Sequence, residues 1–221
     1  MCGRFTIAKT KEQVLSFLKE NFNITNFDNL SLPRYNISPS QPLITLINSK
    51  ANFKAGLINW DYKIKYKNKL KQVINSRSET INKLYSFKDA FKHKRCLILA
   101  DSFYEWDRTS KQPYRFLLND ESLYFYAGIY DSYQKDSKKH YGALIITTKA
   151  NDLVKEHHLR MPVILDTATA KKYLDYSLEL EEVKALLNPY PSELMKSYPV
   201  SKAVNNPKND RLEIIKKTTK N

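Results

Sequence analysis

Cys2 is the residue with the most distinctive chemistry in this chain, because only Met1 precedes it. A residue as small as cysteine at this position normally allows the initiator methionine to be removed, which leaves Cys2 with both a free α-amine and a thiol. The ordinary pKa values of these groups are about 7.7–8.0 and about 8.5, so both are partly deprotonated near neutral pH. A 1,2-aminothiol condenses with an aldehyde to an imine, and its sulfur then closes a five-membered thiazolidine ring. Cysteine also occurs at position 2 by chance, so the rest of the chain must decide.

Four further stretches place unusual polar residues within otherwise structured sequence: residues 35–41, 75–80, 103–106 and 158–162. Each candidate has an ordinary explanation when it is taken alone. Glu105 could be an outward-facing strand residue, His158 a loop histidine and Asn75 a cap. The arginines at positions 77 and 160 could be surface charges.

The charge balance narrows the class of partner. The 221 residues carry 37 Lys and Arg against 23 Asp and Glu, which gives a net charge of +14. Such an excess is typical of proteins that bind a polyanion, most often nucleic acid. A lysine-rich composition inherited from an AT-rich genome would produce the same excess, so charge alone does not establish nucleic-acid binding.

Other features of the composition restrict the cellular setting. Hydrophobic residues make up 42% of the chain and aromatic residues 12%, as in a globular protein. Two cysteines give neither a disulfide framework nor a metal-binding spacing, and Cys96 reads as part of a buried strand. We therefore expect no metal and no cofactor. Without a long apolar run or a signal-peptide core, we expect no membrane contact and a cytoplasmic protein, associated with the nucleoid when bound to DNA.

Sequence patterns predict a mixture of short helices and many strands. Thr10 and Gln13 resemble a capping box before an amphipathic helix. Residues 33–42 indicate a turn-rich connector. Residues 80–92 predict a second helix in which Leu84 faces inward. Alternating lysines at positions 63–71 indicate a solvated loop rather than a strand. Compact apolar or aromatic runs predict strands at 43–47, 97–100, 103–106, 114–118, 124–130 and 143–148, and short helices are expected after Asp166 and within 178–187. These elements predict an α+β fold, with residues 1–221 forming a single mixed domain that has a mainly antiparallel, barrel-like β core and peripheral helices.

Four separated motifs occur together and in order: Cys2-Gly3-Arg4-Phe5, Asn75-Ser76-Arg77-Ser78-Glu79-Thr80, the strand from Arg95 to Trp106, and His158-Leu159-Arg160-Met161-Pro162. In this combination the chain resembles the SOS-response-associated peptidase (SRAP) family, whose members are also described as abasic-site processing proteins. The segment from Val200 to Asp210 is similar to the family's C-terminal region. Leu99 and Ser102 depart from the family's usual Pro and Gly, and residues 55–60 look like a shortened Trp-Gly-Leu-Ile-Pro-x-Trp stretch.

The resemblance implies a reaction that suits the aminothiol. An abasic site in DNA exposes a sugar whose ring-opened form is an aldehyde, which Cys2 would capture as a covalent thiazolidine crosslink. The resemblance assigns acid–base catalysis to Glu105, hydrogen bonding to the sugar oxygen to His158, and positioning of the amine or sugar to Asn75. It implies single-stranded DNA containing an abasic site as the partner, and we expect the protein to bind it as a monomer.

The resemblance also implies which residues contact DNA. Arg4, Arg77 and Arg160 each lie within two residues of a proposed catalytic residue and are predicted to bind phosphates. Pro39, Trp60 and Trp106 are predicted to pack on bases. Removal of Met1, either by Cys2 itself or by the general aminopeptidase, and an abasic-site lyase side reaction are further implied activities.

Two other functions use some of the same residues. A thiol peptidase with an N-terminal nucleophile would use Cys2, Asn75 and His158, but would not explain the arginines or the net charge. A passive nucleic-acid binder would explain the charge, but would not need Cys2 and Glu105. Covalent capture of abasic DNA is therefore the preferred interpretation.

Overall fold

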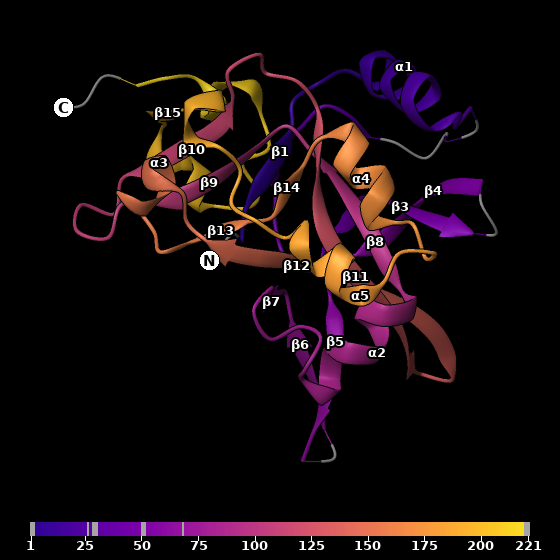
Figure 1. Cartoon of the computed structure of the whole chain (residues 1–221). Coiled ribbons are helices and arrows are strands. Elements are labelled where there is room, and N and C mark those ends of the chain that lie inside the picture. Colours follow the sequence, from indigo (N-terminus) through magenta and orange to yellow (C-terminus); the bar gives the residue numbers. More distant parts are fainter. Residues whose placement is uncertain (1–2, 26, 28–30, 50–51, 68, 219–221) are drawn as a thin grey trace.

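The computed structural model describes residues 3–25, 27, 31–49, 52–67 and 69–218, and apolar runs in these residues build two sheets and a separate hairpin (Figure 1). The first sheet has five strands. Their order across the sheet is β15 (Met195–Pro199), β10 (Pro113–Leu118), β9 (Ser102–Trp106), β1 (Phe5–Ile7) and β2 (Arg34–Ile37). All neighbouring strands in this sheet are antiparallel.

The second sheet closes on itself. Its order is β13 (Arg160–Pro162), β12 (Lys138–Lys149), β4 (Asn52–Asn59), β3 (Pro42–Ser49), β8 (Arg95–Ala100), β11 (Tyr124–Lys135) and β14 (Ile164–Leu165), while β7 (Asn75–Arg77) also pairs with β12. An additional pairing joins β12 to β11, which completes a ring of five strands. The sequence-based prediction of a mainly antiparallel, barrel-like core is thereby confirmed.

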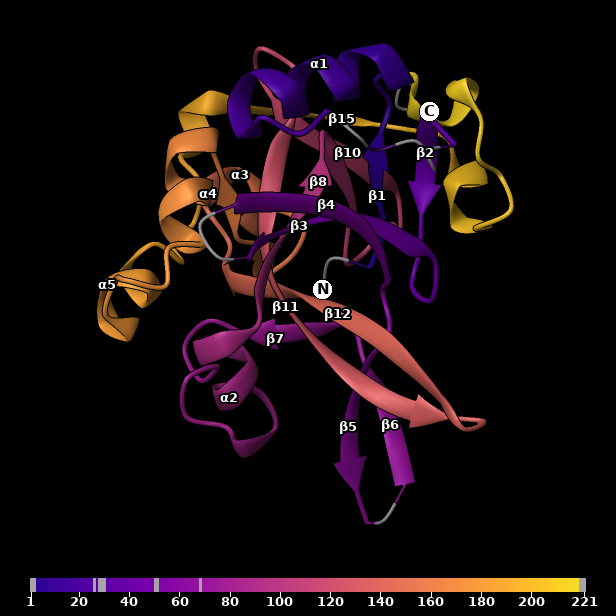
Figure 2. The same cartoon turned by 90° about the vertical axis from the view of Figure 1, so that its right-hand side faces the viewer.

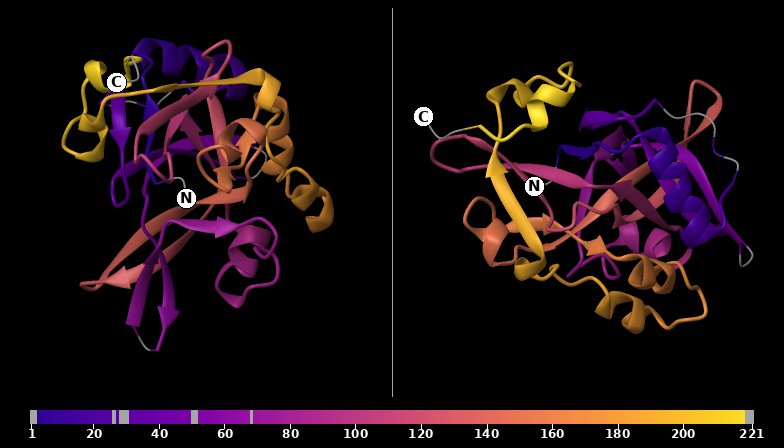
Figure 3. Two further views of the ribbon diagram at one scale, coloured as in Figure 1. Left: turned by 90° about the vertical axis from the view of Figure 1, so that its left-hand side faces the viewer. Right: turned by 90° about the horizontal axis from the view of Figure 1, so that it is seen from above.

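Helices lie on the outside of these sheets, as Figure 3 shows for α1, α4 and α5. The α-helices are α1 (Lys11–Phe22), α2 (Tyr85–His93), α3 (Asp152–Lys155), α4 (Thr167–Tyr173) and α5 (Leu180–Ala185), and the 3₁₀ turns are η1 (Ser192–Leu194), η2 (Lys202–Asn205) and η3 (Leu212–Ile215). Thr10 and Gln13 form the predicted capping box at the start of α1, and Val14, Leu18 and Phe22 of this helix are buried. Within the described residues, no helix is both long and apolar enough to span a membrane.

Three local predictions were wrong. The expected connector 33–42 contains strand β2, and the expected lysine loop is a hairpin of β5 (Tyr62–Tyr66) and β6 (Lys69–Val73). Leu84 is 46% exposed rather than inward-facing, because it is the N-cap of α2. The hairpin forms because Tyr62 at its base is buried and donates to the Ser86 carbonyl at 3.1 Å, a long-range contact that the local pattern does not reveal.

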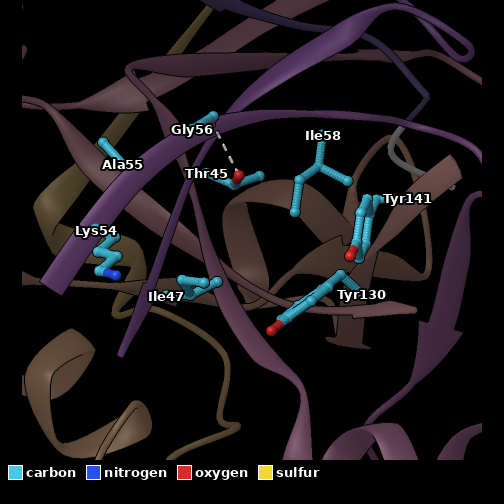
Figure 4. Close-up of a pocket in the computed structure, with 8 residues that line it drawn as sticks. All are labelled: Thr45, Ile47, Lys54, Ala55, Gly56, Ile58, Tyr130 and Tyr141. Carbon is cyan, nitrogen blue, oxygen red and sulfur yellow. Dashed lines mark hydrogen bonds between the residues drawn. The ribbon is translucent and has the colours of Figure 1, made fainter. Parts of the chain in front are cut away.

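A pocket of about 370 Å³ opens over β3 and β4, opposite Tyr130 and Tyr141 (Figure 4). The small residues Ala55 and Gly56 line it together with Ile58. A Cβ atom added at Gly56 would meet nothing within 4 Å. Small side chains in the shortened motif therefore leave this space open.

Gly142, unlike Gly56, is tightly surrounded by other backbone, at the point where β12 pairs with the end of β4. A Cβ atom added there would lie 2.1 Å from the Asp61 carbonyl oxygen and 2.6 Å from its carbonyl carbon. We expect Gly142→Ala to lower the free energy of unfolding by about 1–3 kcal/mol, because backbone must move to admit the methyl group. Urea denaturation would measure this loss. Gly56→Ala is the matched control and should be neutral or slightly stabilising. Equal stabilities for the two variants would contradict the close approach.

Candidate functional site

Strand β9 places Glu105 between two other strands. Tyr114 of β10 lies directly opposite Glu105, and β1 pairs with the other edge of β9. Glu105 is only 3% exposed and lies on the same side of the strand as Phe103, which packs in the main core. Desolvation raises the pKa of the Glu105 carboxyl to about 7. At neutral pH this side chain is therefore divided between its acid and base forms.

Strand β1 carries the chain's amino-terminal segment along β9. Phe5 lies opposite Phe103, and the Tyr104 amide donates to the Arg4 carbonyl at 3.0 Å. The same register, continued by two residues beyond Phe5, sets Gly3 opposite Glu105. Cys2 precedes Gly3 directly and lies outside the described residues, so its predicted role stays a prediction.

Strand β7 presents Asn75 and Arg77 on one side. It runs parallel to β12, with Asn75 opposite Ile145 and Arg77 opposite Thr147. Asn75 is half-buried and Arg77 exposed, while the intervening Ser76 is buried and its carbonyl accepts from Thr147 Oγ1 at 3.1 Å. Both predicted residues are thus fixed by the same strand pairing.

His158 lies in the turn between α3 and β13. Its Nδ1 lies 3.0 Å from the Arg160 amide nitrogen and 3.2 Å from the Arg160 carbonyl oxygen. Nδ1 accepts from the amide when the ring proton is on Nε2, and donates to the carbonyl when Nδ1 itself carries the proton. Desolvation lowers the pKa of His158, and the positive charges of Arg108 and Arg160 act in the same direction. His158 is consequently a neutral hydrogen-bond donor at physiological pH.

The adjacent His157 connects this turn to the Glu105 strand. His157 is 8% exposed, and its ring packs against Tyr114 with ring centroids 4.0 Å apart. Since Tyr114 lies opposite Glu105, the turn that bears His158 packs against the end of the β9–β10 pair. The two neighbouring histidines therefore have separate roles, with His157 serving in packing.

Arg160 makes internal contacts. Its guanidinium binds both carboxylate oxygens of Glu79, at 2.5 and 2.9 Å, and donates to the Thr147 carbonyl at 2.6 Å. The hydrogen bond from Arg160 lowers the pKa of the Glu79 carboxyl. Glu79 lay inside a recognised motif, but sequence reasoning gave it no role. The pair ties the end of β7 to β13 across β12.

Arg4 and Trp106 both contact the C-terminal turns. Arg4 donates to Asn36 Oδ1 and to the Val204 carbonyl, each at 2.7 Å, and Trp106 Nε1 donates to Asn205 Oδ1 at 2.7 Å. The Asn36 amide nitrogen lies within hydrogen-bond distance of three carbonyls between residues 204 and 209. Figure 2 shows these turns, in yellow, beside β2. Asn36 was part of a noted stretch, yet its organising role depends on contacts far along the chain.

The three residues predicted to contact bases differ in their exposure to solvent. Pro39 is half-buried at a turn, and Trp106 is partly exposed. Trp60 is completely buried, forms an edge contact with Phe5 and donates through Nε1 to the Ile74 carbonyl at 2.8 Å. The prediction that Trp60 packs on bases was therefore wrong, since neither face of its ring is accessible.

The fold is shared with solved structures. A crystal structure of a protein from Bacteroides thetaiotaomicron superposes with a TM-score of 0.82 at 22% sequence identity, covering 99% of this chain and 100% of that one. A protein from Bordetella bronchiseptica superposes with a TM-score of 0.74 at 23% identity, covering 90% of this chain and 100% of that one. These similarities establish the architecture.

The strand arrangement, the four motifs and the sequence comparisons together define the class. The chain belongs to the SOS response associated peptidase (SRAP) family, whose family model matches residues 1–207. It is 38% identical to the abasic site processing protein YoqW of Bacillus subtilis, over 97% of this chain and 99% of that protein. It is 28% identical to the abasic site processing protein YedK of Escherichia coli, over 97% and 99% respectively.

Proposed function

We propose that this protein processes abasic sites in single-stranded DNA by forming a covalent crosslink through Cys2. The observation that carries the proposal is the buried Glu105, whose pKa of about 7 places a proton donor and acceptor beside the path of the amino-terminal strand. The names of the similar proteins support abasic DNA as the substrate.

The reaction begins with removal of Met1, which exposes the Cys2 amine. The amine attacks C1′ of the ring-opened abasic sugar, and the aldehyde oxygen leaves as water to give an imine. The Cys2 sulfur then adds to the same carbon while the thiol proton passes to nitrogen, which closes the thiazolidine. In this scheme Glu105 accepts a proton from the attacking amine and delivers a proton to the departing oxygen.

The other polar residues position the substrate in this scheme. His158, neutral and protonated on Nε2, donates to the sugar oxygen, and Asn75 holds the amine or sugar without a charge that would keep the amine protonated. Arg4, Arg77 and Arg160 bind backbone phosphates, with the exposed Arg77 the most available in the present conformation. Glu79 must then share or release Arg160 when DNA binds.

Single-stranded DNA fits this scheme because its sugars are not held in a stacked duplex. We further propose that the protein acts as a monomer associated with the nucleoid. The imine would also allow β-elimination, which cleaves the DNA strand as a lyase does, and Cys2 would assist removal of Met1.

The test is denaturing gel electrophoresis of the protein with a single-stranded oligonucleotide that carries one abasic site. Intact-mass analysis first verifies the loss of Met1. We expect a slowly migrating band that requires the abasic site, disappears in Cys2→Ala, and persists in the matched control Cys96→Ala. Cys96 is the other thiol and is buried in β8.

Absence of the band from protein of verified mass would overturn crosslinking. DNA-independent hydrolysis of peptides would then favour the thiol peptidase. Protection of abasic DNA by Cys2→Ala as effectively as by wild type would favour the passive binder.

A further inference from the structure

The β5–β6 hairpin concentrates positive charge on an element that projects from the barrel (Figures 1 and 2). Residues 62–73 contain five lysines and no acidic residue. Lys65, Lys67, Lys69 and Lys71 are all exposed. No salt bridge within the described ranges involves any of these four lysines. Their charges are therefore available to a partner from outside the chain.

The register of the hairpin distributes these charges over both of its faces. Lys65 lies opposite Leu70, whereas Lys69 lies opposite Tyr66 and Lys71 opposite Ile64. Directly opposed side chains share a face, so Lys65 is on one face and the other two are on the reverse. Every described lysine of the strands faces a neutral residue, which avoids direct repulsion across the pair.

The base of the hairpin is anchored, although an isolated two-stranded hairpin is marginally stable. Gln72 Nε2 donates to Ser40 Oγ at 3.0 Å and to the Trp60 carbonyl at 3.3 Å. The Ser40 amide in turn donates to the Trp60 carbonyl at 3.0 Å. These bonds join the hairpin to the turn that contains Pro39.

The hairpin also leads directly into the candidate site. Strand β6 ends at Val73, and β7 begins at Asn75. At about 3.3 Å per residue, Lys69 lies up to about 20 Å along the chain from Asn75. A DNA strand that passes Arg77 and the Pro39 turn can thus continue along the hairpin.

Exposed aromatic residues accompany the lysines. Tyr66 is 57% exposed, and Tyr85 of α2 is 88% exposed. Tyr85 borders a groove of about 500 Å³ that Lys63 and Lys65 also line. Lysines interleaved with accessible rings are typical of surfaces that follow a nucleic-acid backbone without reading its sequence.

We propose that the β5–β6 hairpin binds the phosphodiester backbone of DNA flanking the abasic nucleotide. This inference rests on the proposed function for the identity of the DNA, but its binding step needs neither Cys2 nor an abasic site. The surface would add sequence-independent affinity and would orient the flanking strand relative to Asn75.

The test measures binding of undamaged oligonucleotides by fluorescence anisotropy across a series of salt concentrations. The variant Lys65→Gln/Lys69→Gln/Lys71→Gln removes one charge from one face of the hairpin and two from the other. It retains Lys63, which pairs with Asp61 at 2.6 Å. The matched control is Lys19→Gln/Lys171→Gln/Lys172→Gln, which removes three exposed charges from α1 and α4. One probe is single-stranded, and another has a duplex flank.

We expect the hairpin variant to bind at least about tenfold more weakly than the control at physiological salt. The slope of log K against log salt should fall by about 2 for single-stranded DNA, since each lost phosphate contact contributes about 0.7. The probe that loses more affinity shows whether the hairpin contacts single-stranded or duplex DNA beside the abasic nucleotide. Equal binding by the hairpin and control variants on both probes would overturn the inference.

Crosslinking separates this inference from the proposed function. At saturating protein, the hairpin variant should reach the wild-type yield of crosslink with abasic DNA, because its nucleophile and Glu105 are intact. A salt-dependent loss of binding in a protein that never crosslinks would support the hairpin surface and reject the crosslinking chemistry.

Discussion

Glu105→Gln is expected to slow crosslink formation by about 100- to 10,000-fold, the usual contribution of a positioned acid–base group. Glutamine retains the shape of the side chain but neither accepts nor delivers a proton at neutral pH. The rate is measured under single-turnover conditions by quenching into denaturant and resolving the products on gels. Glu121→Gln, the same change at an exposed site, is the control and should retain the wild-type rate.

The pH dependence of the crosslinking rate tests the role of Glu105 independently. Burial holds the pKa of Glu105 at about 7, so the wild-type rate should show an inflection near that pH. The variant should lose this inflection and retain those of the Cys2 amine and thiol. An unchanged rate with an unchanged profile would remove Glu105 from the mechanism.

Stability should change in the opposite direction to activity. The folded-state pKa of Glu105 lies above the ordinary glutamate value, so folding stability falls as pH rises from about 4.3 through about 7. Glutamine carries no charge to bury, and at pH 8 the variant should be more stable by up to about 3 kcal/mol. Loss of activity therefore cannot be attributed to unfolding if urea denaturation gives this result.

Asp101→Ala is expected to lower the free energy of unfolding by about 3–5 kcal/mol, because it leaves a buried arginine without its charged neighbour. Asp101 is 2% exposed, accepts from Thr6 Oγ1 and the Ala8 amide, and lies 3.7 Å from Arg115. Arg115 is held by Ser102 Oγ at 2.7 Å. This network joins β1 to β9, so crosslinking should also slow. Urea denaturation measures the stability change.

A double-mutant cycle supplies the control. Arg115→Met removes the opposite charge, and Asp101→Ala/Arg115→Met should be less destabilised than the sum of the single variants. Strict additivity would show that the two side chains are not energetically coupled.

Local patterns predicted the elements whose stabilising contacts are close in sequence. The capping box at Thr10 located the start of α1, and continuous apolar runs located β8 to β12. The lysine hairpin was misread because its anchor is a buried Tyr62 that contacts α2. Leu84 was misplaced because α2 begins at Tyr85 rather than at Thr80, which leaves Leu84 at the N-cap position.

In the candidate site too, local motifs predicted some residues, whereas long-range contacts determined others. Residue types in the motifs singled out Asn75, Glu105 and His158, but could not reveal that Glu79 neutralises Arg160 from 81 residues away. Trp60 was interpreted as a base contact because its sequence neighbourhood does not show that it packs against Phe5. Both the Glu79–Arg160 ion pair and the burial of Trp60 depend on contacts between segments that are distant in sequence, and such contacts leave no local pattern in a single sequence.

The bond between Arg4 and Val204 joins residues 200 positions apart, which has a consequence for the order of assembly. At synthesis rates of about 5–20 residues per second, roughly 10–40 s separate the two residues on the ribosome. The amino-terminal strand therefore emerges long before the turns that hold Arg4 exist. The bonds that fix the Arg4 side chain therefore form only after almost the whole chain has been synthesised, although the strand that carries Arg4 is among the first segments to be translated.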